Sequence, residues 1–306
     1  MRYLVTGAAG FIGSHLSQAL IGAGHELVAV DSFNDYYDPA RKEENAAGLA
    51  VVRADLAVDP VGEMVRGADG VFHLAGQPGV RAFGQAFPDY LTRNVLATQR
   101  LFEAAARAGV KVVYASSSSI YGDAERYPTP ESTLPRPNSP YGITKLACEH
   151  LAGAYGRSFG LEAVGLRYFT VYGPRQRPDM AFTRIAEALA EGRPFELYGD
   201  GGQSRSFTYV ADVVEATVLA LAAEPGTIYN VGGGVEATMS EAIALFERIS
   251  GRTLELVQGP PAAGDMRRTK ADVTRIHADL GWEATTALED GLRSQWQWAF
   301  GRVAAR

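Results

Sequence analysis

Apolar runs of strand length alternate with segments of helical periodicity over the first half of the chain. The apolar runs lie at residues 3–6, 26–31, 50–54, 71–74 and 111–115. Short, nearly continuous apolar runs are typical of strands that are buried on both faces of a parallel sheet. A longer segment over residues 86–108 repeats its apolar positions with the spacing of an amphipathic helix. This alternation predicts an α/β fold with a doubly wound parallel sheet, covered by helices on both faces.

The pattern changes at about residue 170. Residues 127–140 are rich in Pro, Ser and Thr and predict a loop, whereas residues 161–168 predict another strand. Beyond residue 170, short helical and strand-like segments alternate irregularly. We therefore expect one domain over residues 1–170 and a smaller, discontinuous lobe over residues 171–306, from which the chain can still cross back to extend the main sheet.

A glycine-rich turn joins the first predicted strand to the first predicted helix. In such a unit Gly7 permits the tight turn, Gly10 lets the backbone approach a pyrophosphate, and Gly13 lets the helix pack on the sheet. The N-terminus of the helix offers N–H groups and a partial positive charge to the phosphates. Asp31 ends the second strand, where its carboxylate accepts hydrogen bonds from an adenosine ribose and repels a 2′-phosphate. With Ser32 where a phosphate-binding arginine would stand, the turn predicts NAD, not NADP.

Further polar and small residues follow other predicted strands. Asp55, Gly76 and the serines at 116–119 each come directly after a strand. Ligands of doubly wound sheets bind beyond the carboxyl ends of the strands. We therefore expect these residues to lie together with the glycine-rich turn and Asp31 along one edge of the sheet.

Tyr141 and Lys145 lie one helical turn apart at the start of a helix that Ser139 and Pro140 are expected to begin. A free tyrosine loses its proton only near pH ~10 and is a poor base at neutral pH. A fixed ammonium group or a bound nicotinamide cation nearby favours the phenolate. A packed tyrosine beside a solvated lysine has the same spacing, so the rest of the sequence must decide between the two interpretations.

Charge, cysteine content and hydropathy exclude several classes of protein. The 306 residues include 29 basic and 35 acidic ones, for a formal charge of −6, whereas a nucleic-acid-binding protein usually needs a basic face. Cys148 is the only cysteine, so no internal disulfide is possible, and we expect it to be part of the core. The five histidines lack metal-ligand spacing, which predicts no metal site. With no cleavable signal and no apolar run of ~18 residues, we expect no membrane contact and a cytoplasmic location.

Several stretches together resemble the extended short-chain dehydrogenase/reductase family, in particular its nucleotide-sugar epimerase branch. They run essentially end to end, at residues 6–13, 55–56, 73–76, 117–122, 141–145, 166–169 and 199–212. The resemblance implies a Rossmann fold with a C-terminal substrate-binding lobe, and a catalytic set of Ser117, Tyr141 and Lys145. The NAD-binding residues that it implies are Gly7, Gly10, Phe11, Ile12, Gly13, Asp31, Asp55, Leu56, Leu74, Ala75, Gly76, Asn94, Tyr141, Lys145 and Tyr168.

Ser118 and Ser119 distinguish between the reactions of this family. Dehydratases that resemble this chain carry Asp-Glu at these two positions, and decarboxylases carry Glu at the second. Those acids handle protons at another carbon of the sugar, whereas a hydroxyl is a poor acid or base near neutral pH. The two serines therefore favour an epimerase, which needs no second acid–base pair.

A narrower resemblance is to UDP-glucuronate 4-epimerases. It rests on residues 34–39, 169–174 and 177–181. Thr170 stands where UDP-galactose 4-epimerases usually carry Asn, and together with Arg177 it is suited to bind a sugar carboxylate. Arg177 can equally face solvent or the pyrophosphate. The chain departs from the pattern at Arg175-Gln176 and after Arg81. The substrate-binding residues implied are Arg81, Ser118, Ser119, Thr170, Arg177, Met180, Arg205 and Arg267.

The reaction that the resemblance implies is NAD-dependent inversion at carbon 4 of a UDP-sugar, most simply UDP-glucuronate to UDP-galacturonate, through a 4-keto intermediate. Epimerisation of UDP-glucose or UDP-N-acetylglucosamine, decarboxylation of UDP-glucuronate, and a non-enzymatic NAD-binding module remain open. The segments 86–108 and 141–159 lie in the usual dimer face of the family, so we expect a homodimer. Leu91, Val95, Leu101 and Phe102 on the first segment are equally suited to the core.

Overall fold

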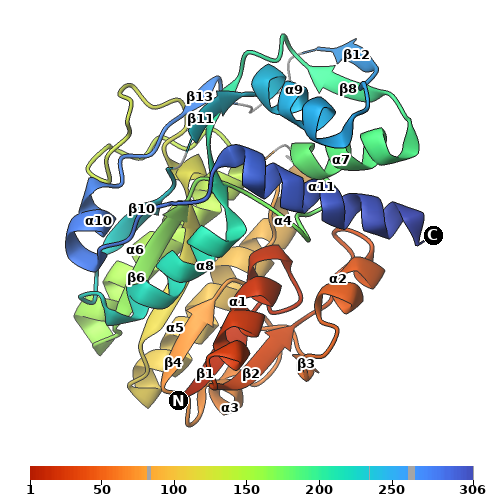
Figure 1. The fold of residues 1–306 in the computed structure, drawn as a ribbon. Coiled ribbons are helices and arrows are strands. Elements are labelled where there is room, and N and C mark those ends of the chain that lie inside the picture. The colour runs from red at the N-terminus through yellow and green to blue at the C-terminus, as the bar shows by residue number, and fades with distance from the viewer. Residues whose placement is uncertain (81–83, 234, 261–265, 306) are drawn as a thin grey trace.

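The computed structural model describes residues 1–80, 84–233, 235–260 and 266–305, and a parallel sheet runs through its larger part (Figure 1). The order of its seven described strands is β3-β2-β1-β4-β5-β6-β10. Their bounds are β1 Arg2–Thr6, β2 Glu26–Asp31, β3 Val51–Arg53, β4 Gly70–His73, β5 Val112–Ser117, β6 Ala163–Tyr168 and β10 Ile228–Val231. The α/β fold with a doubly wound parallel sheet is thereby confirmed.

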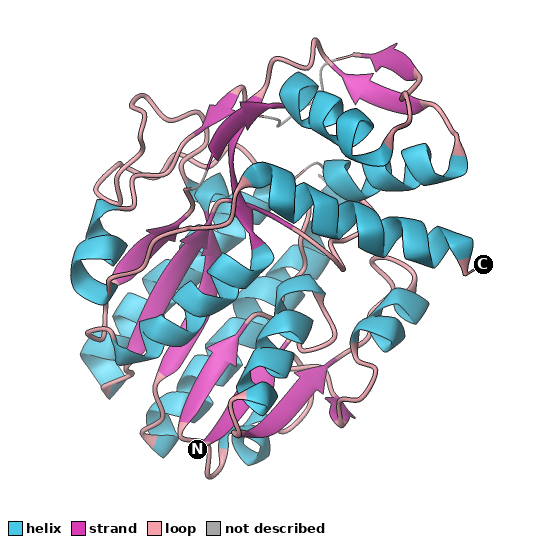
Figure 2. Ribbon diagram, viewed as in Figure 1, coloured by secondary structure: helices cyan, strands magenta, loops and turns pink. Residues whose placement is uncertain are grey.

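Helices cover both faces of this sheet, and alternating strand residues supply the two cores (Figure 2). Leu4 and Val71 point into one core, and the next residues, Val5 and Phe72, point into the other. The first core is shared by α3 (Val61–Val65), α5 (Ala97–Ala108) and α6 (Pro140–Phe159). The second is shared by α1 (Phe11–Gly22), α8 (Val210–Leu219) and α10 (Thr274–Leu280). Burial on both faces explains why these strands are apolar throughout.

The predicted helix over residues 86–108 is a composite. It contains α4 (Phe87–Tyr90), a π-helical turn η2 (Leu91–Leu96) and α5, preceded by the 3₁₀ turn η1 (Gly84–Ala86). π-helical turns inside α-helices are frequent at functional sites. Asn94, predicted to bind a cofactor, lies in this one.

A smaller lobe lies at the carboxyl ends of the main strands (Figure 1). Its central strand, β9, pairs with β7, β11 and β13, while β8 pairs with β12. Phe182, Phe207 and Phe246 form the middle of its core. The bounds are β7 Thr170–Tyr172, α7 Ala181–Glu191, β8 Phe195–Tyr198, β9 Ser204–Tyr209, β11 Val235–Thr238, α9 Met239–Ser250, β12 Leu256–Gly259, β13 Arg268–Thr269 and α11 Leu288–Ala304.

The chain crosses back between the lobes. After β9 it forms α8 and the 3₁₀ turn η4 (Ala220–Ala222), and then β10, which pairs with β6 at the edge of the main sheet. The first lobe also contains α2 (Pro39–Asn45) and the 3₁₀ turn η3 (Ser118–Ile120). The large sheet thus takes its last strand, β10, from beyond residue 170. The domain boundary at that residue stays a prediction.

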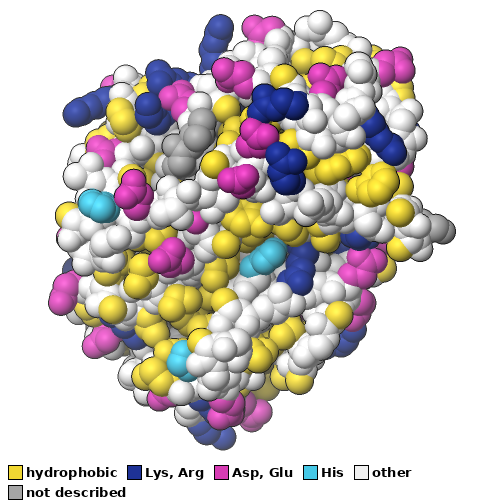
Figure 3. All heavy atoms as spheres, viewed as in Figure 1, with side chains coloured by type: hydrophobic (Ala, Val, Ile, Leu, Met, Phe, Trp, Pro, Cys, Tyr) yellow, Lys and Arg dark blue, Asp and Glu magenta, His cyan; other side chains and the backbone are white. Residues whose placement is uncertain are grey.

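Charged side chains of both signs are interspersed over the face shown in Figure 3. Over the described ranges, no helix is both long and apolar enough to cross a lipid bilayer. In the same part of the chain, His, Cys, Asp and Glu side chains do not gather in groups of three or more that are able to hold a metal ion.

Candidate active site

A cavity of about 790 Å³ lies between the carboxyl ends of the main strands and the smaller lobe. Both lobes contribute to its wall. The sequence-predicted residues on that wall are Gly7, Gly10, Phe11, Ile12, Gly13, Asp31, Asp55, Leu56, Leu74, Ala75, Gly76, Ser117, Ser118, Ser119, Tyr141, Lys145, Tyr168, Thr170, Met180, Arg177 and Arg205. The structure thus brings nearly all of the candidate residues to one site.

The glycine-rich turn fits a dinucleotide phosphate. A Cβ atom on Gly13 would lie 2.0 Å from the carbonyl oxygen of Gly7, so only glycine lets α1 start so close to the turn. Among the described side chains, none caps the N-terminus of α1 after Gly10. The first turn of the helix therefore presents backbone N–H groups to the cavity, as a pyrophosphate site requires.

Asp31 is positioned by two backbone groups. Its Oδ1 accepts a hydrogen bond from the Phe33 N–H at 2.8 Å, and its Oδ2 accepts one from the Ala9 N–H at 3.1 Å. The side chain is buried, and each carboxylate oxygen has further acceptor capacity. The geometry suits a pair of ribose hydroxyls, while a 2′-phosphate would meet a negative charge.

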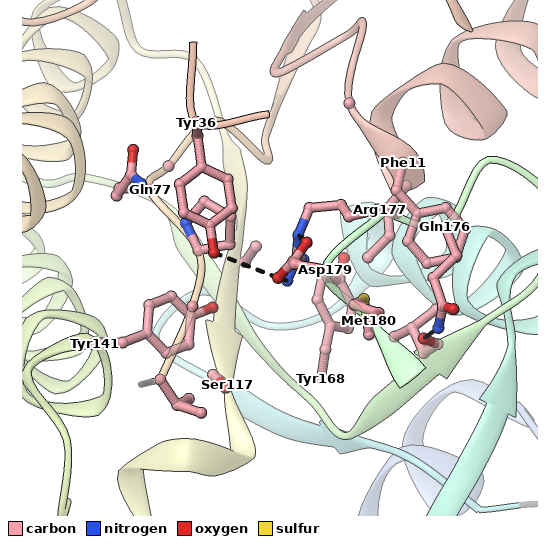
Figure 4. A pocket seen from close by; sticks show the side chains of 18 of the residues that line it. Phe11, Tyr36, Gln77, Ser117, Tyr141, Tyr168, Gln176, Arg177, Asp179 and Met180 are labelled. Carbon is pink, nitrogen blue, oxygen red and sulfur yellow. Dashed lines mark hydrogen bonds and ion pairs between the residues drawn. The ribbon is translucent and has the colours of Figure 1, made fainter. Parts of the chain in front are cut away.

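The start of α6 is fixed against residues 116–119, here named the serine loop. Ser139 caps the helix by accepting a hydrogen bond from the Gly142 N–H at 3.1 Å, and Pro140 is the first helical residue. A Cβ atom on Gly142 would lie 2.5 Å from the carbonyl oxygen of Ser119. This close approach places Tyr141 and Ser117 on the same side of the cavity, as Figure 4 shows.

Lys145 lies on the same face of α6 as Tyr141. Its Nζ atom is 5.8 Å from the centroid of the Tyr141 ring, and it donates a hydrogen bond to the carbonyl oxygen of Ala115 at 2.9 Å. The Ser117 hydroxyl accepts a hydrogen bond from the Ser119 N–H at 3.1 Å and contacts the Ser119 hydroxyl at 3.1 Å. A phenol, a fixed ammonium group and an oriented hydroxyl therefore line the same cavity.

Three candidate site residues lie off the cavity wall or outside the described residues. Asn94 is buried behind the cavity wall. Its side-chain amide is hydrogen-bonded to both backbone groups of Gln77 and to the Thr144 hydroxyl. Arg267 is exposed to solvent, and its backbone carbonyl oxygen accepts a hydrogen bond from the Ser204 N–H. Arg81 lies outside the described residues. Cys148 is buried, and burial raises the pKa of its thiol, as expected of a core residue.

Arg177 reaches the cavity from the loop before α7, and its partners were missed from the sequence. Its Nε and Nη2 atoms donate to Oδ1 and Oδ2 of Asp179, both at 3.0 Å, and Tyr36 Oη donates to Oδ2 at 3.3 Å (Figure 4). Burial acts to raise the pKa of Asp179, but the Arg177 guanidinium outweighs it and holds this pKa below its usual value. Burial and the nearby Asp179 raise the pKa of Tyr36 to about 12. Tyr36 and Asp179 both belong to the segments that resemble UDP-glucuronate 4-epimerases. This resemblance is the signal in the sequence that could have pointed to them.

A buried ion pair braces the serine loop from behind. Arg167 donates from Nε and Nη2 to the two carboxylate oxygens of Glu149, at 2.9 and 2.8 Å, and from Nη1 to the Tyr121 hydroxyl at 2.7 Å. The Ser116 hydroxyl donates to Glu149 Oε1 at 2.5 Å. Because Glu149 lies one turn after Lys145 on α6, this network joins α6 to the end of β5.

The smaller lobe supplies the other side of the cavity. Thr170 begins β7, and Met180 immediately precedes α7. Arg205 lies on β9, where its guanidinium donates to the carbonyl oxygens of Ser204 and Met266. Gln176 also lines the cavity, with its side chain bonded to Thr183 and to the carbonyl oxygen of Val171. This half can accommodate a ligand that extends beyond the dinucleotide.

Comparison with known proteins gives three kinds of match. The sequence model of the NAD dependent epimerase/dehydratase family matches residues 3–232. The crystal structure of UDP-glucuronic acid 4-epimerase from Bacillus cereus, in complex with UDP-glucuronic acid and NAD, is 38% identical, with a TM-score of 0.96 over 99% of this chain and 100% of that one. A probable UDP-glucuronate 4-epimerase from Rhizobium meliloti is 33% identical, over 97% of this chain and 96% of that one. UDP-glucose 4-epimerase from Mycolicibacterium smegmatis is 38% identical, over 95% and 96%.

Proposed function

We propose that this chain, which belongs to the NAD dependent epimerase/dehydratase family, inverts carbon 4 of a UDP-linked hexuronic acid and so interconverts UDP-glucuronate and UDP-galacturonate. The observation that carries the proposal is the shared cavity of Ser117, Tyr141, Lys145 and Arg177. The first three are the groups needed to move a hydroxyl proton, and the fourth is a cation suited to a sugar carboxylate.

The residues present fit NAD. The turn from Gly7 to Gly13 would hold its pyrophosphate, Asp31 its adenosine ribose, and Lys145 its nicotinamide ribose. When bound, NAD supplies an acceptor for the hydride of carbon 4 and returns that hydride later in the same turnover. The protein's own contribution is to bind, orient and move the proton.

Tyr141 is the base for the 4-hydroxyl of the sugar. As the phenolate it accepts the hydroxyl proton while Ser117 orients the same oxygen by a hydrogen bond. The resulting 4-keto sugar must turn its other face toward the cofactor, and Tyr141 then returns the proton to the oxygen. Ser118 and Ser119 add only hydroxyls to this wall, so the described part of the serine loop offers no acid or base for chemistry at a second carbon.

Arg177 and Thr170 together distinguish a uronic acid from a neutral sugar. A guanidinium and a hydroxyl on the cavity wall can bind the carboxylate at carbon 5 by charge-assisted hydrogen bonds. The 4-keto form of a uronic acid is a β-keto acid and loses CO₂ readily. Holding its carboxylate in an ionised form, with no carboxylic acid nearby on the serine loop, favours return of the hydride over that loss.

A neutral substrate is the second candidate. The positive charge of Arg177 is already paired with Asp179 inside the protein, and this pairing lowers the need for a substrate carboxylate. UDP-glucose and UDP-N-acetylglucosamine are then the alternatives. In either case the UDP group would lie toward the smaller lobe, where Arg205 is the candidate cation for its pyrophosphate and Arg267 stays a sequence prediction.

Supplying the three UDP-sugars separately to the purified protein tests the proposal. UDP-glucuronate should give UDP-galacturonate, identified by NMR, without net formation of NADH. A pentose product with release of CO₂ would indicate the decarboxylase instead. The variant Arg177→Ala should lose most turnover of UDP-glucuronate while it keeps any turnover of UDP-glucose. Unchanged turnover of UDP-glucuronate would remove the carboxylate role of Arg177.

We also propose a homodimer formed through the helical segments 87–108 and 140–159. Leu91, Ile143 and Phe159 are exposed on these segments, whereas Leu101 and Phe102 are fully buried and belong to the core. Exposed apolar side chains on two neighbouring helices are a common basis for association. Light scattering on the wild type and on Ile143→Glu would test this proposal. The cytoplasmic location stays a prediction.

A further inference from the structure

Arg177 is held along one edge of its guanidinium group by a carboxylate two residues away. The Nε and Nη2 atoms make parallel 3.0 Å hydrogen bonds to the two oxygens of Asp179. This side-on pairing occupies the Nε/Nη2 edge. In the described contacts, the Nη1/Nη2 edge remains able to donate to a second planar anion. The arrangement therefore leaves room for a substrate carboxylate on the same guanidinium group.

Tyr36 holds Asp179 from the other side of the cavity. Its hydroxyl donates to Asp179 Oδ2 at 3.3 Å, and Figure 4 shows this hydrogen bond extending between opposite sides of the site. The segment that carries Tyr36 is itself anchored. The Tyr36 N–H donates to Asn34 Oδ1, and Lys42 Nζ donates to both oxygens of Asn34, at 2.8 and 2.9 Å. Because this segment follows Asp31, the bond links the ribose side of the cavity to Arg177.

The position of Tyr36 is also defined relative to the catalytic tyrosine. A Cβ atom on Gly79 would lie 2.5 Å from Tyr36 Oη, so only glycine at that position admits the phenol. The carbonyl oxygen of Gly79 accepts a hydrogen bond from Tyr90 Oη at 2.6 Å, and the Tyr90 ring lies 6.4 Å from that of Tyr141, centroid to centroid. The chain of contacts from Arg177 therefore ends at the residue that is expected to take the substrate proton.

We propose that Asp179 is the positioning residue that fixes Arg177 for the carboxylate of a uronic acid, and that Tyr36 holds Asp179 in turn. This inference rests on the proposed function. Asp179 acts through Arg177 and does not contact the reacting carbon. The opposite role, in which Asp179 imitates the substrate carboxylate and competes with it, predicts that removing its charge tightens binding. The side-on geometry favours positioning, because the other edge of the guanidinium group is left for the substrate.

The variant Asp179→Asn tests the inference through substrate selectivity. Losing a charge-assisted pair should raise KM for UDP-glucuronate roughly tenfold, with a smaller fall in kcat. Turnover of UDP-glucose, which has no carboxylate, should change much less. The matched control is Asp35→Asn, which removes the same charge from an exposed residue next to Tyr36. Tyr36→Phe, which removes one neutral hydrogen bond, should raise KM for UDP-glucuronate by a factor of about five.

A double-mutant cycle separates positioning from general structural damage. The quantity compared is the ratio of kcat/KM for UDP-glucuronate to kcat/KM for UDP-glucose. If Asp179 acts through Arg177, then adding Asp179→Asn to Arg177→Ala leaves this ratio unchanged. The inference is overturned if the two substitutions lower this ratio additively. It is also overturned if the Asp179→Asn variant has an unchanged or lower KM for UDP-glucuronate. A wild-type protein that does not convert UDP-glucuronate removes the proposed function as well. If the wild type converts UDP-glucuronate and the Asp179→Asn variant has the same kinetic constants, this inference alone is removed.

Discussion

The Nζ atom of Lys145 lies 5.8 Å from the centre of the Tyr141 ring, while its hydrogen bond to the Ala115 carbonyl group holds it at the end of β5. The lysine therefore joins α6 to β5, the strand that leads into the serine loop. Its charge is fixed beside the phenol, and it cannot move away without giving up a partly buried hydrogen bond.

Removing the phenol oxygen should abolish proton transfer but leave the fold intact. We expect Tyr141→Phe to lower kcat for epimerisation by a factor of about 10²–10⁴, the usual contribution of a general acid–base group. The NAD content of the purified protein and its thermal midpoint should stay close to those of the wild type. Turnover within tenfold of the wild type would show that another group takes the proton.

A methyl group on Gly142 should separate Tyr141 from the serine loop. Since its Cβ atom would lie 2.5 Å from the Ser119 carbonyl oxygen, Gly142→Ala must displace either α6 or that loop. We expect kcat to fall by more than tenfold, as small displacements from reacting geometry typically cause. Gly301→Ala in α11 is the control, because its Cβ atom would meet no atom within 4 Å among the described residues. Equal activity of the two variants would contradict the proposed packing.

The glycine-rich turn and the alternation of strands and helices were predictable, because each depends on local sequence. Gly13 occupies a position at which short-range geometry allows little choice, because its Cβ atom would lie 2.0 Å from the Gly7 carbonyl oxygen. The pairing of Tyr36 with Asp179 was not predictable, because the two residues are far apart in sequence and meet only after both lobes have folded. The position of Asn94 behind the wall was hidden for the same reason, since its partner Thr144 is on another helix.

The buried pair of Arg167 and Glu149 should be important for stability. The two side chains are 7% and 5% exposed, so removing one partner leaves an uncompensated charge. We expect Arg167→Met to lower the free energy of unfolding by about 3–5 kcal/mol in urea titrations. The matched control is Arg136→Met, which breaks an exposed pair with Glu125 and should cost about 0–1 kcal/mol. Adding Glu149→Leu to Arg167→Met should restore part of the loss, and no recovery would contradict the charge argument.

A buried histidine, His73, and a half-buried one, His15, should make the protein sensitive to acid. Burial lowers the pKa of His73 to about 3 and that of His15 to about 4. The unfolded chain binds these protons below pH ~6.5 while the folded protein does not, so stability should fall as the pH falls from there towards 4 and below. Unfolding titrations at several pH values measure this slope. His15→Gln should make it shallower, and an unchanged slope would show that His15 is not responsible.

The most direct test of the account is to supply UDP-glucuronate carrying deuterium at carbon 4 to the purified protein in ordinary water. The account predicts UDP-galacturonate with the deuterium still on carbon 4, detected by NMR, because the hydride leaves and returns within one cavity while only the oxygen proton exchanges through Tyr141. Product that has lost the label, a labelled or unlabelled pentose, or no conversion at all would contradict it.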